Sequence, residues 1–248
     1  MRAVILAGGR GTRLAPYTTV FPKPLVPVGE LPIIEIILRQ LQAQGINRVT
    51  LAVGYLAELI RAYLEQRSEV FHSLSIDYVS ELSPTGTAGA IGSIPDLADE
   101  PFFLVMNGDV LTTIDLAAMI EHHVSTGSDM TIACAARSVK IDLGVLEIND
   151  GLVTGYREKP SIPYDVSMGV YLYSPRAHSW IQPGVYLDFP DLILKMIAAG
   201  QRVTPFPTDC LWLDIGRHED YATATEVFDA NRDAFLPDGE RNVQRDSK

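Results

Sequence analysis

Near its amino terminus the chain reads Leu6-Ala7-Gly8-Gly9-Arg10-Gly11-Thr12-Arg13-Leu14 and, shortly afterwards, Phe21-Pro22-Lys23-Pro24-Leu25. The run Ala3-Val4-Ile5-Leu6 before it is short and apolar, which predicts a buried parallel strand. Three glycines follow within four residues, so the backbone can turn sharply and approach a ligand without a Cβ in the way. Successive backbone N–H groups in such a turn form a concavity that suits phosphate oxygens.

Two cations accompany this turn. Arg13 offers a fork of donors and Lys23 a point charge, and the prolines on either side of Lys23 restrict its backbone. The segment is not a dinucleotide fingerprint, because no third glycine follows Gly11 at the required spacing. It is not a Walker loop either, because Gly-Lys-Ser and Gly-Lys-Thr are both absent from the sequence. Taken alone, a glycine cluster after a strand is a tight turn; with the two cations it predicts a triphosphate cradle.

Composition limits the function classes. With 248 residues and 47% hydrophobic residues, the chain can bury a core as one domain, with or without an annex. A net charge of −11 argues against a nucleic-acid surface but allows a local basic pocket for a phosphorylated small molecule. The sequence shows neither a signal-peptide pattern nor an apolar run of membrane-spanning length, and Cys134 and Cys210 read as reduced core residues. We therefore expect a cytoplasmic protein without nucleic-acid or membrane partners.

Strand-like and helix-like segments alternate along the chain, which predicts crossover units and a parallel sheet covered on both faces. In such sheets ligands gather at the carboxyl ends of the strands, where the glycine turn lies. Strands are predicted at residues 46–53, 74–79, 101–106 and 130–135, and helices at 32–45, 55–66, 115–126, 188–199 and 219–231.

A carboxylate follows the strand-like run at residues 101–106. The run 101–106 ends in Asn107-Gly108-Asp109, which places Asp109 across from the glycine turn. A magnesium ion bound to phosphates needs an oxygen ligand at such a position. The alternative is that Asn-Gly-Asp is only a turn.

Taken in order, these motifs resemble the signature of the sugar-1-phosphate nucleotidyltransferases, from Met1 to about Asn231. The closest similarity is to mannose-1-phosphate and heptose-1-phosphate guanylyltransferases. The resemblance implies a Rossmann-like α/β/α sandwich with a mostly parallel central sheet and a small mixed β annex. It implies a single domain over residues 1–236, with a nucleotide-binding part at 1–135 and a sugar-binding part with a closing helix at 136–236. Residues 237–248 are expected to form a loose tail.

The resemblance also assigns roles to residues. Arg13 and Lys23 would hold the triphosphate and the leaving pyrophosphate, and Asp109 would act with them. Leu211-Trp212-Leu213-Asp214-Ile215-Gly216 is similar to the family's Trp-Xaa-Asp-Ile-Gly element, whose aspartate completes a Mg²⁺ site with Asp109. The nucleotide-binding residues of the first turn would be Leu6, Ala7, Gly8, Gly9, Gly11 and Thr12.

The segment from Ser80 to Ala90 is expected to contact the base. Glu81 can only accept hydrogen bonds, and guanine presents two adjacent donors, whereas uracil and thymine present one donor between two acceptors. Glu81 with Gly86 and Thr87 therefore favours guanine, and Gly-Thr-Ala-Gly is similar to the guanylyltransferase branch. The alternative is that Glu81 is an ordinary solvated loop residue.

In the part of the chain that is predicted to bind the sugar, the alternation of strands and helices is replaced by short strands. Residues 144–148 and 152–156 read as short strands joined by a hairpin turn. Glu158-Lys159-Pro160 resembles the family's Glu-Lys-Pro element, although Arg157-Glu158-Lys159 alone would read as a solvated charge run. Ser167 stands where many relatives carry asparagine, which leaves the sugar open. The predicted sugar-phosphate residues are Gly144, Glu158, Lys159, Ser167 and Gly169.

The reaction implied is transfer of a nucleotidyl group from an NTP, with GTP favoured, to a sugar 1-phosphate. It yields an NDP-sugar and pyrophosphate by Mg²⁺-assisted in-line attack, a step in nucleotide-sugar and polysaccharide biosynthesis. Two alternatives stay open: a cytidylyl-, uridylyl- or thymidylyltransferase acting on another phosphate, and a non-catalytic sensor of the same ligands. Homo-oligomers occur in the family, so self-association is compatible with this sequence.

Overall fold

The computed structural model describes residues 1–80 and 84–236. One seven-stranded sheet forms the centre, in the order β12-β8-β11-β6-β1-β4-β5. Every neighbouring pair is parallel except those of β11, which is antiparallel to both β6 and β8. The mostly parallel sheet predicted from the sequence is confirmed. The strands are β1 (Arg2–Ala7), β4 (Arg48–Val53), β5 (Ser75–Ser80), β6 (Phe103–Asn107), β8 (Met130–Lys140), β11 (Ser161–Tyr173) and β12 (Val203–Pro207).

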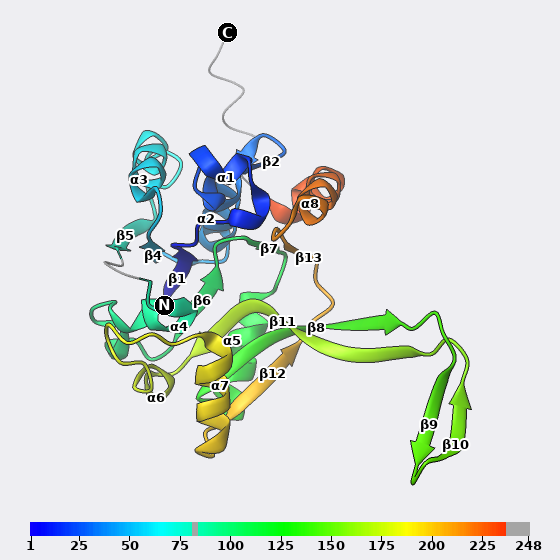
Figure 1. The fold of residues 1–248 in the computed structure, drawn as a ribbon. Coiled ribbons are helices and arrows are strands. Elements are labelled where there is room, and N and C mark those ends of the chain that lie inside the picture. Colours follow the sequence, from blue (N-terminus) through cyan, green and yellow to red (C-terminus); the bar gives the residue numbers. More distant parts are fainter. Residues whose placement is uncertain (81–83, 237–248) are drawn as a thin grey trace.

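Helices cover both faces of the sheet (Figure 1). Alternate residues of β1 point to opposite sides, so Ala3 and Ile5 join one apolar cluster and Val4 joins the other. Helices α2, α3, α5 and α8 contribute to the first cluster, and α4 and α7 to the second. Among the described helices, none is both long and apolar enough to cross a bilayer. The helices that contribute to the two clusters are α2 (Ile33–Ala43), α3 (Ala57–Gln66), α4 (Gly86–Gly92), α5 (Leu116–Thr126), α7 (Phe189–Ala198) and α8 (His218–Ala230), and the shorter helices include α1 (Tyr17–Val20) and α6 (Pro175–His178).

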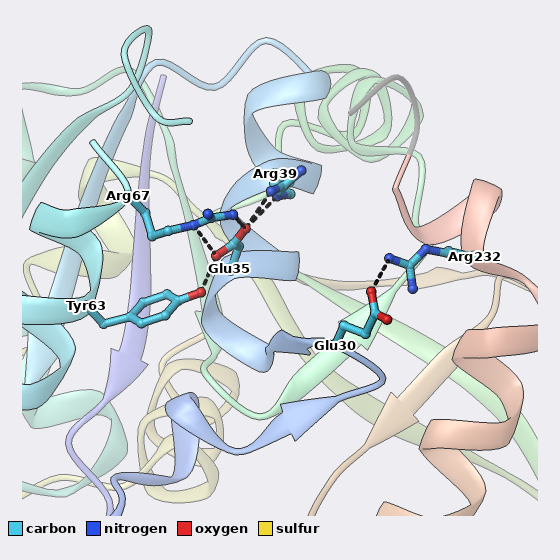
Figure 2. A network of polar contacts seen from close by, with 6 residues as sticks. All are labelled: Glu30, Glu35, Arg39, Tyr63, Arg67 and Arg232. Carbon is cyan, nitrogen blue, oxygen red and sulfur yellow. Dashed lines mark hydrogen bonds and ion pairs between the residues drawn. The ribbon is translucent and has the colours of Figure 1, made fainter. Parts of the chain in front are cut away.

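A buried charge lies inside the apolar pattern of α2. Glu35 is 0% exposed and accepts hydrogen bonds from Arg39, Arg67 and the hydroxyl of Tyr63 (Figure 2). Burial alone would raise the pKa of Glu35, but the hydrogen bonds from these three partners prevail and lower it. Burial, and then the hydrogen bond to Glu35, raises the pKa of Tyr63 to about 12. The cluster fastens α2 to α3. A more exposed ion pair, Glu30 with Arg232 at 3.8 Å, joins the turn between β2 (Pro27–Val28) and β3 (Leu31–Pro32) to α9 (Arg232–Phe235).

The structure departs from the sequence prediction at β8, which was expected to end at Ala135 and continues to Lys140, and at its partner β11, which was not predicted as a strand. Beyond Cys134 it pairs only with the first half of β11, and the two strands lead into a hairpin of β9 (Val145–Asn149) and β10 (Leu152–Arg157). We call residues 136–165 the arm. Figure 1 shows the arm standing away from the rest of the chain.

Candidate functional site

A cavity of about 520 Å³ opens at the carboxyl ends of β1 and β6, where a parallel sheet is expected to hold its ligand. Its volume is that of a site for a small molecule. The cavity brings together all the predicted nucleotide-site residues of the first turn, both cations, Asp109 and the two described base-loop residues. Its lining is Leu6, Ala7, Gly8, Gly9, Gly11, Thr12, Arg13, Lys23, Pro24, Ala52, Pro84, Gly86, Thr87, Ala90, Asn107, Gly108, Asp109 and Asp188.

The glycines of the first turn serve different purposes. Gly11 has φ 61°, and a Cβ there would lie 2.9 Å from the methyl group of Thr18, so both conformation and space call for glycine. The Thr18 hydroxyl donates to the carbonyl oxygen of Gly11 at 2.7 Å and fixes the turn. Gly9 is different, because a Cβ there would meet nothing within 4 Å. Its missing side chain therefore leaves room in the cavity itself.

A close contact between the end of β1 and the turn after β6 fixes the position of Asp109. The N–H of Gly108 donates to the carbonyl oxygen of Leu6 at 2.9 Å, and a Cβ on Gly108 would lie 2.6 Å from that oxygen. Any larger residue would push the turn away from β1. The close approach places Asp109 beside the glycine turn, where its carboxylate forms an ion pair with the mostly buried amine of Lys23.

A second carboxylate reaches the same place from the far end of the chain. Asp214 ends β13 (Trp212–Asp214), which pairs with β7 (Val110–Thr112) so that Asp214 lies opposite Val110. The N–H of Ile215 also donates to the carbonyl oxygen of Asp109 at 3.0 Å. Loss of solvation raises the pKa of Asp214 and the charge of Asp109 raises it further, while Lys23 and Arg13 act in the opposite direction. Two carboxylates that repel each other form a place where a cation is favoured.

This donor set fits a magnesium ion bound together with phosphates. Within the described residues, no group of three or more His, Cys, Asp or Glu side chains gathers around one point. Mg²⁺ is commonly held by one or two carboxylates and completed by water and substrate phosphates. Asp109 and Asp214 supply the two carboxylates, and the pairing of β13 with β7 and the hydrogen bond from the N–H of Ile215 to the carbonyl oxygen of Asp109 hold them side by side.

Asp188 is a site residue that the sequence analysis missed. It was expected only to begin the helix α7, but its side chain points elsewhere and lines the cavity. Its carboxylate accepts from the N–H of Thr87 at 2.9 Å, at the start of α4, and from the hydroxyl of Tyr186 at 2.6 Å. The hydrogen bond from Tyr186, and then that from Thr87, lowers the pKa of Asp188. An Asp before Phe-Pro signals a helix start, but nothing in that signal indicates a partner about 100 residues away.

The predicted sugar-phosphate residues fall into two groups. Gly169 is buried beside the cavity, since a Cβ on it would lie 2.6 Å from the amide nitrogen of Asn107. Ser167, two residues earlier, donates to the hydroxyl of Tyr171 at 3.0 Å. The other three, Gly144, Glu158 and Lys159, lie on the arm and are exposed. None of the five predicted sugar-phosphate residues is part of the described lining of the cavity. Their assignment to the sugar phosphate stays a prediction.

Glu81, the residue on which the preference for guanine depends, lies outside the described residues. Its neighbours Gly86 and Thr87 are described and line the cavity. Gly86 has φ 81°, and a Cβ on it would lie 2.6 Å from the carbonyl oxygen of Leu187. The small residues of α4 thus allow it to pack closely on the segment that carries Asp188.

The fold and the cavity together are those of an α/β protein that receives its ligand at the carboxyl ends of parallel strands. More particularly, residues 2–231 match the nucleotidyl transferase family, and the chain belongs to that family.

Relatives with assigned activities cover most of the chain. It is 31% identical over 225 residues to D-glycero-α-D-manno-heptose 1-phosphate guanylyltransferase of Aneurinibacillus thermoaerophilus, covering 90% of this chain and 96% of that one. It is 33% identical to mannose-1-phosphate guanylyltransferase 1 of Arabidopsis thaliana, covering 92% of this chain but only 64% of the plant protein. The crystal structure of HddC from Yersinia pseudotuberculosis is 28% identical, with a TM-score of 0.69 over 92% of this chain and 99% of that one. HddC has also been solved in complex with GMP-PN.

Proposed function

We propose that this chain transfers the guanylyl group of GTP to a sugar 1-phosphate, with release of pyrophosphate. The observation that carries the proposal is the convergence of the glycine turn, Arg13, Lys23 and Asp109 on one cavity, with Asp214 held next to Asp109 by the pairing of β13 with β7. The similarity to a heptose-1-phosphate guanylyltransferase over 90% of the chain supports both the reaction and the substrate class. Free thiols at both Cys134 and Cys210 support a cytoplasmic location, where nucleoside triphosphates and thiol reductants are present.

The chemistry requires positioning rather than a covalent intermediate on the protein. A phosphate oxygen of the sugar 1-phosphate attacks the α-phosphorus of GTP, a new P–O bond forms, and the bond to the β-phosphate oxygen breaks. Pyrophosphate leaves with the electron pair, so negative charge grows on the leaving group. Arg13 lies at the cavity wall and is the cation best placed to stabilise that charge, because its fork can hold two phosphate oxygens at once.

The amine of Lys23 can pair either with Asp109 or with a phosphate of the nucleotide. In the absence of nucleotide its amine neutralises Asp109. Asp109 and Asp214 would hold a Mg²⁺ ion that neutralises phosphate charge and orients the reacting phosphates. Were that ion held by Asp109, the ammonium group of Lys23 would be available to bind a phosphate of the nucleotide. In this arrangement Asp109 would have a cation as its partner both with and without the nucleotide.

The preference for guanine is proposed from Glu81 and the relatives. A carboxylate accepts from both the ring N–H and the exocyclic amine of guanine, whereas a pyrimidine with one donor leaves it partly unpaired. Glu81→Gln should therefore narrow the ratio of kcat/KM for GTP over UTP by roughly 1–3 kcal/mol. If the ratio of kcat/KM for GTP over UTP is the same in wild type and Glu81→Gln, Glu81 does not determine the preference for guanine.

The reaction is tested by a pyrophosphate-release assay with GTP, UTP, dTTP and CTP, each combined with mannose 1-phosphate, a heptose 1-phosphate and glucose 1-phosphate. We expect release only when both substrates and Mg²⁺ are present, and the highest kcat/KM with GTP. Faster release with UTP, dTTP or CTP would reassign the base. Binding of GTP without turnover in any combination would favour the ligand sensor over the transferase.

A further inference from the structure

Among the described residues, the guanidinium of Arg13 has no hydrogen-bonding or ionic partner. Arg13 is exposed at the cavity wall, whereas Lys23, the other cation there, is mostly buried and paired with Asp109. A long side chain without a partner samples several rotamers, and ordering it in one geometry costs free energy. The position of Arg13 therefore depends on how its backbone is held and on the charges around its guanidinium.

The backbone that follows Arg13 is held by the first turn of α8. The Nε2–H of His218 donates to the carbonyl oxygen of Ala15 at 2.6 Å, although 203 residues separate the two in the sequence. The ring centroid of Tyr17 lies 5.8 Å from the ring of His218 and 5.8 Å from the ring of Tyr221, which are three residues apart on α8. Aromatic rings attract each other at this separation. These contacts fasten the segment after Arg13 to the start of α8.

The same turn of α8 brings a carboxylate towards the guanidinium of Arg13. A Cβ on Gly216 would lie 3.5 Å from Oδ1 of Asp214, 3.6 Å from Oδ2 of Asp220 and 3.8 Å from Nη1 of Arg13. The three charged atoms therefore surround one point. Opposite charges attract at such a separation without a direct ion pair, so Asp220 favours conformations of Arg13 that keep its guanidinium near Asp214.

A short connection joins this turn of α8 to the carboxylate of the proposed metal site. Asp214 ends β13, and α8 begins four residues later at His218. Between them, Ile215 is fully buried, and its N–H donates to the carbonyl oxygen of Asp109 at 3.0 Å. The connection thus fixes the first turn of α8 relative to both carboxylates. A contact made by this turn places its partner relative to the same two groups.

We propose that the first turn of α8 positions Arg13 for the chemical step, through the hydrogen bond of His218 to Ala15 and through the charge of Asp220. His218 and Asp220 are positioning residues, because neither is part of the described lining of the cavity. The inference rests on the proposed function for the role of Arg13, whereas the contacts do not depend on it. Positioning matters because a small misplacement of a group that stabilises the leaving pyrophosphate lowers the rate steeply.

Hydrogen exchange in the absence of substrates tests whether α8 holds the segment. The N–H groups of Ala15, Thr19 and Phe21 bond to carbonyl oxygens within that segment, so their exchange reports its opening. His218→Leu keeps an apolar side chain beside Tyr17 but removes the donor. We expect it to speed the exchange of these amides on the order of fivefold, the effect of one hydrogen bond.

Two further variants make the exchange experiment specific. His218→Gln supplies an amide donor and should restore slow exchange. His72→Ala is the matched control, because His72 also bonds to a backbone carbonyl, that of Glu69, but within its own turn. It should leave the exchange of the segment after Arg13 unchanged. Equal exchange of that segment in wild type and His218→Leu would overturn the proposal whatever reaction the protein catalyses.

Steady-state kinetics test whether the contact acts through Arg13. We expect His218→Leu to lower kcat about tenfold with little change in the KM for GTP, and His218→Gln to restore kcat. In a protein that already carries Arg13→Lys, His218→Leu should lower kcat by less than about threefold, because residues that act through each other are not additive. A full tenfold loss in that background, or faster exchange with wild-type kcat, would show that α8 does not position Arg13.

The charge of Asp220 is tested in the same assay. Asp220→Asn should lower kcat with little change in KM, and Glu219→Gln is the matched control, since Glu219 is an exposed acid in the same turn. Equal kinetics of Asp220→Asn and Glu219→Gln would remove Asp220 from the proposal. A wild-type protein that releases no pyrophosphate with any pair of substrates would refute the proposed function and the role of Arg13, while the exchange rates would still decide whether α8 holds the segment.

Discussion

Asp109 and Asp214 differ in how their charges are balanced. Asp109 is paired with Lys23, whereas the pKa of Asp214 is raised by loss of solvation and by Asp109. The free protein therefore holds the two carboxylates in a state that a divalent cation would relieve. This arrangement favours binding of the cation and the nucleotide together, because the nucleotide's phosphates supply ligands that the protein lacks.

At the residue scale, we expect Asp109→Asn and Asp214→Asn each to lower turnover by at least ~10²-fold, since a metal ligand is lost. Circular dichroism and thermal unfolding should show an intact fold. Asp99→Asn removes an exposed carboxylate elsewhere and serves as the control. Near wild-type turnover of both site variants at limiting Mg²⁺ would show that these carboxylates do not hold the metal.

Arg13 should matter more to the chemical step than to binding, because charge grows on the leaving pyrophosphate. Arg13→Lys keeps the charge and loses the fork, so kcat should fall with little change in the KM for GTP. Arg10→Lys is the matched control in the same turn, since Arg10 stacks near Tyr55 at 5.8 Å and is not part of the described cavity lining. If the only defect of Arg13→Lys is a raised KM, Arg13 merely binds ground-state phosphate.

The sequence was informative about residues that act near their own strand. The glycine turn and Asp109 could be predicted because each follows a buried strand closely, and the sheet brings such ends together. Lys23 could be predicted because it lies shortly after the glycine turn, between two prolines. Asp188 could not, because its partner Thr87 lies on another element and its own position signals a helix start. Glu35 was also missed, since a single acid in an apolar helical pattern gives no indication of its three partners.

At the element scale, Asp188 connects α4 to the segment before α7. Asp188→Ala leaves the N–H of Thr87 without this acceptor, and we expect a loss of about 1 kcal/mol in the free energy of unfolding. The KM for GTP should also rise, because α4 lines the cavity. Urea unfolding and steady-state kinetics measure the two effects. Asp191→Ala, three residues further along, is the control, and equal losses in both variants would contradict the role of Asp188.

The Glu35 cluster gives a pH-dependent prediction. The pKa of Glu35 is lowered in the folded state, so its contribution to stability is present above the ordinary value of 4.5 and is lost as the pH falls through the folded-state pKa. Glu35→Gln should destabilise the protein by about 3 kcal/mol at neutral pH, because it removes a fully buried charge from the ion pairs with the partly exposed Arg39 and Arg67. The difference from wild type should shrink below pH 4.5.

Urea unfolding of both proteins across this pH range measures that difference. Glu65→Gln, an exposed acid on α3, is the control and should change stability little at any pH. A difference between wild type and Glu35→Gln that stays constant from neutral to acid pH would show that packing, and not the charge of Glu35, is what the cluster contributes.

The arm shows where sequence patterns stop being informative for an element. The hairpin of β9 and β10 was predictable from Asn149-Asp150-Gly151. The extension of β8 to Lys140 was not, because Arg137-Ser138-Val139-Lys140 reads equally well as a loop. Hydrophobic periodicity indicates which residues face a core, and none of residues 136–165 is buried in a core.

At the scale of the whole molecule, a chain with a net charge of −11 presents a cavity whose wall carries Arg13 and Lys23. The glycine turn and the Asp109 turn lie at the same end of the central sheet, and β13 pairs with β7 directly after the Asp109 turn. The central claim is therefore about one site: GTP lies with its α-phosphorus facing a sugar phosphate and its pyrophosphate held by the two cations.

The fate of individual phosphorus atoms tests that claim most directly. GTP labelled at the α-phosphate and GTP labelled at the γ-phosphate are each incubated with mannose 1-phosphate, a heptose 1-phosphate or glucose 1-phosphate in the presence of Mg²⁺, and the products are separated. We expect the α label to appear in the nucleotide-sugar and the γ label in pyrophosphate. Recovery of the γ label in orthophosphate or in a sugar bisphosphate would contradict nucleotidyl transfer.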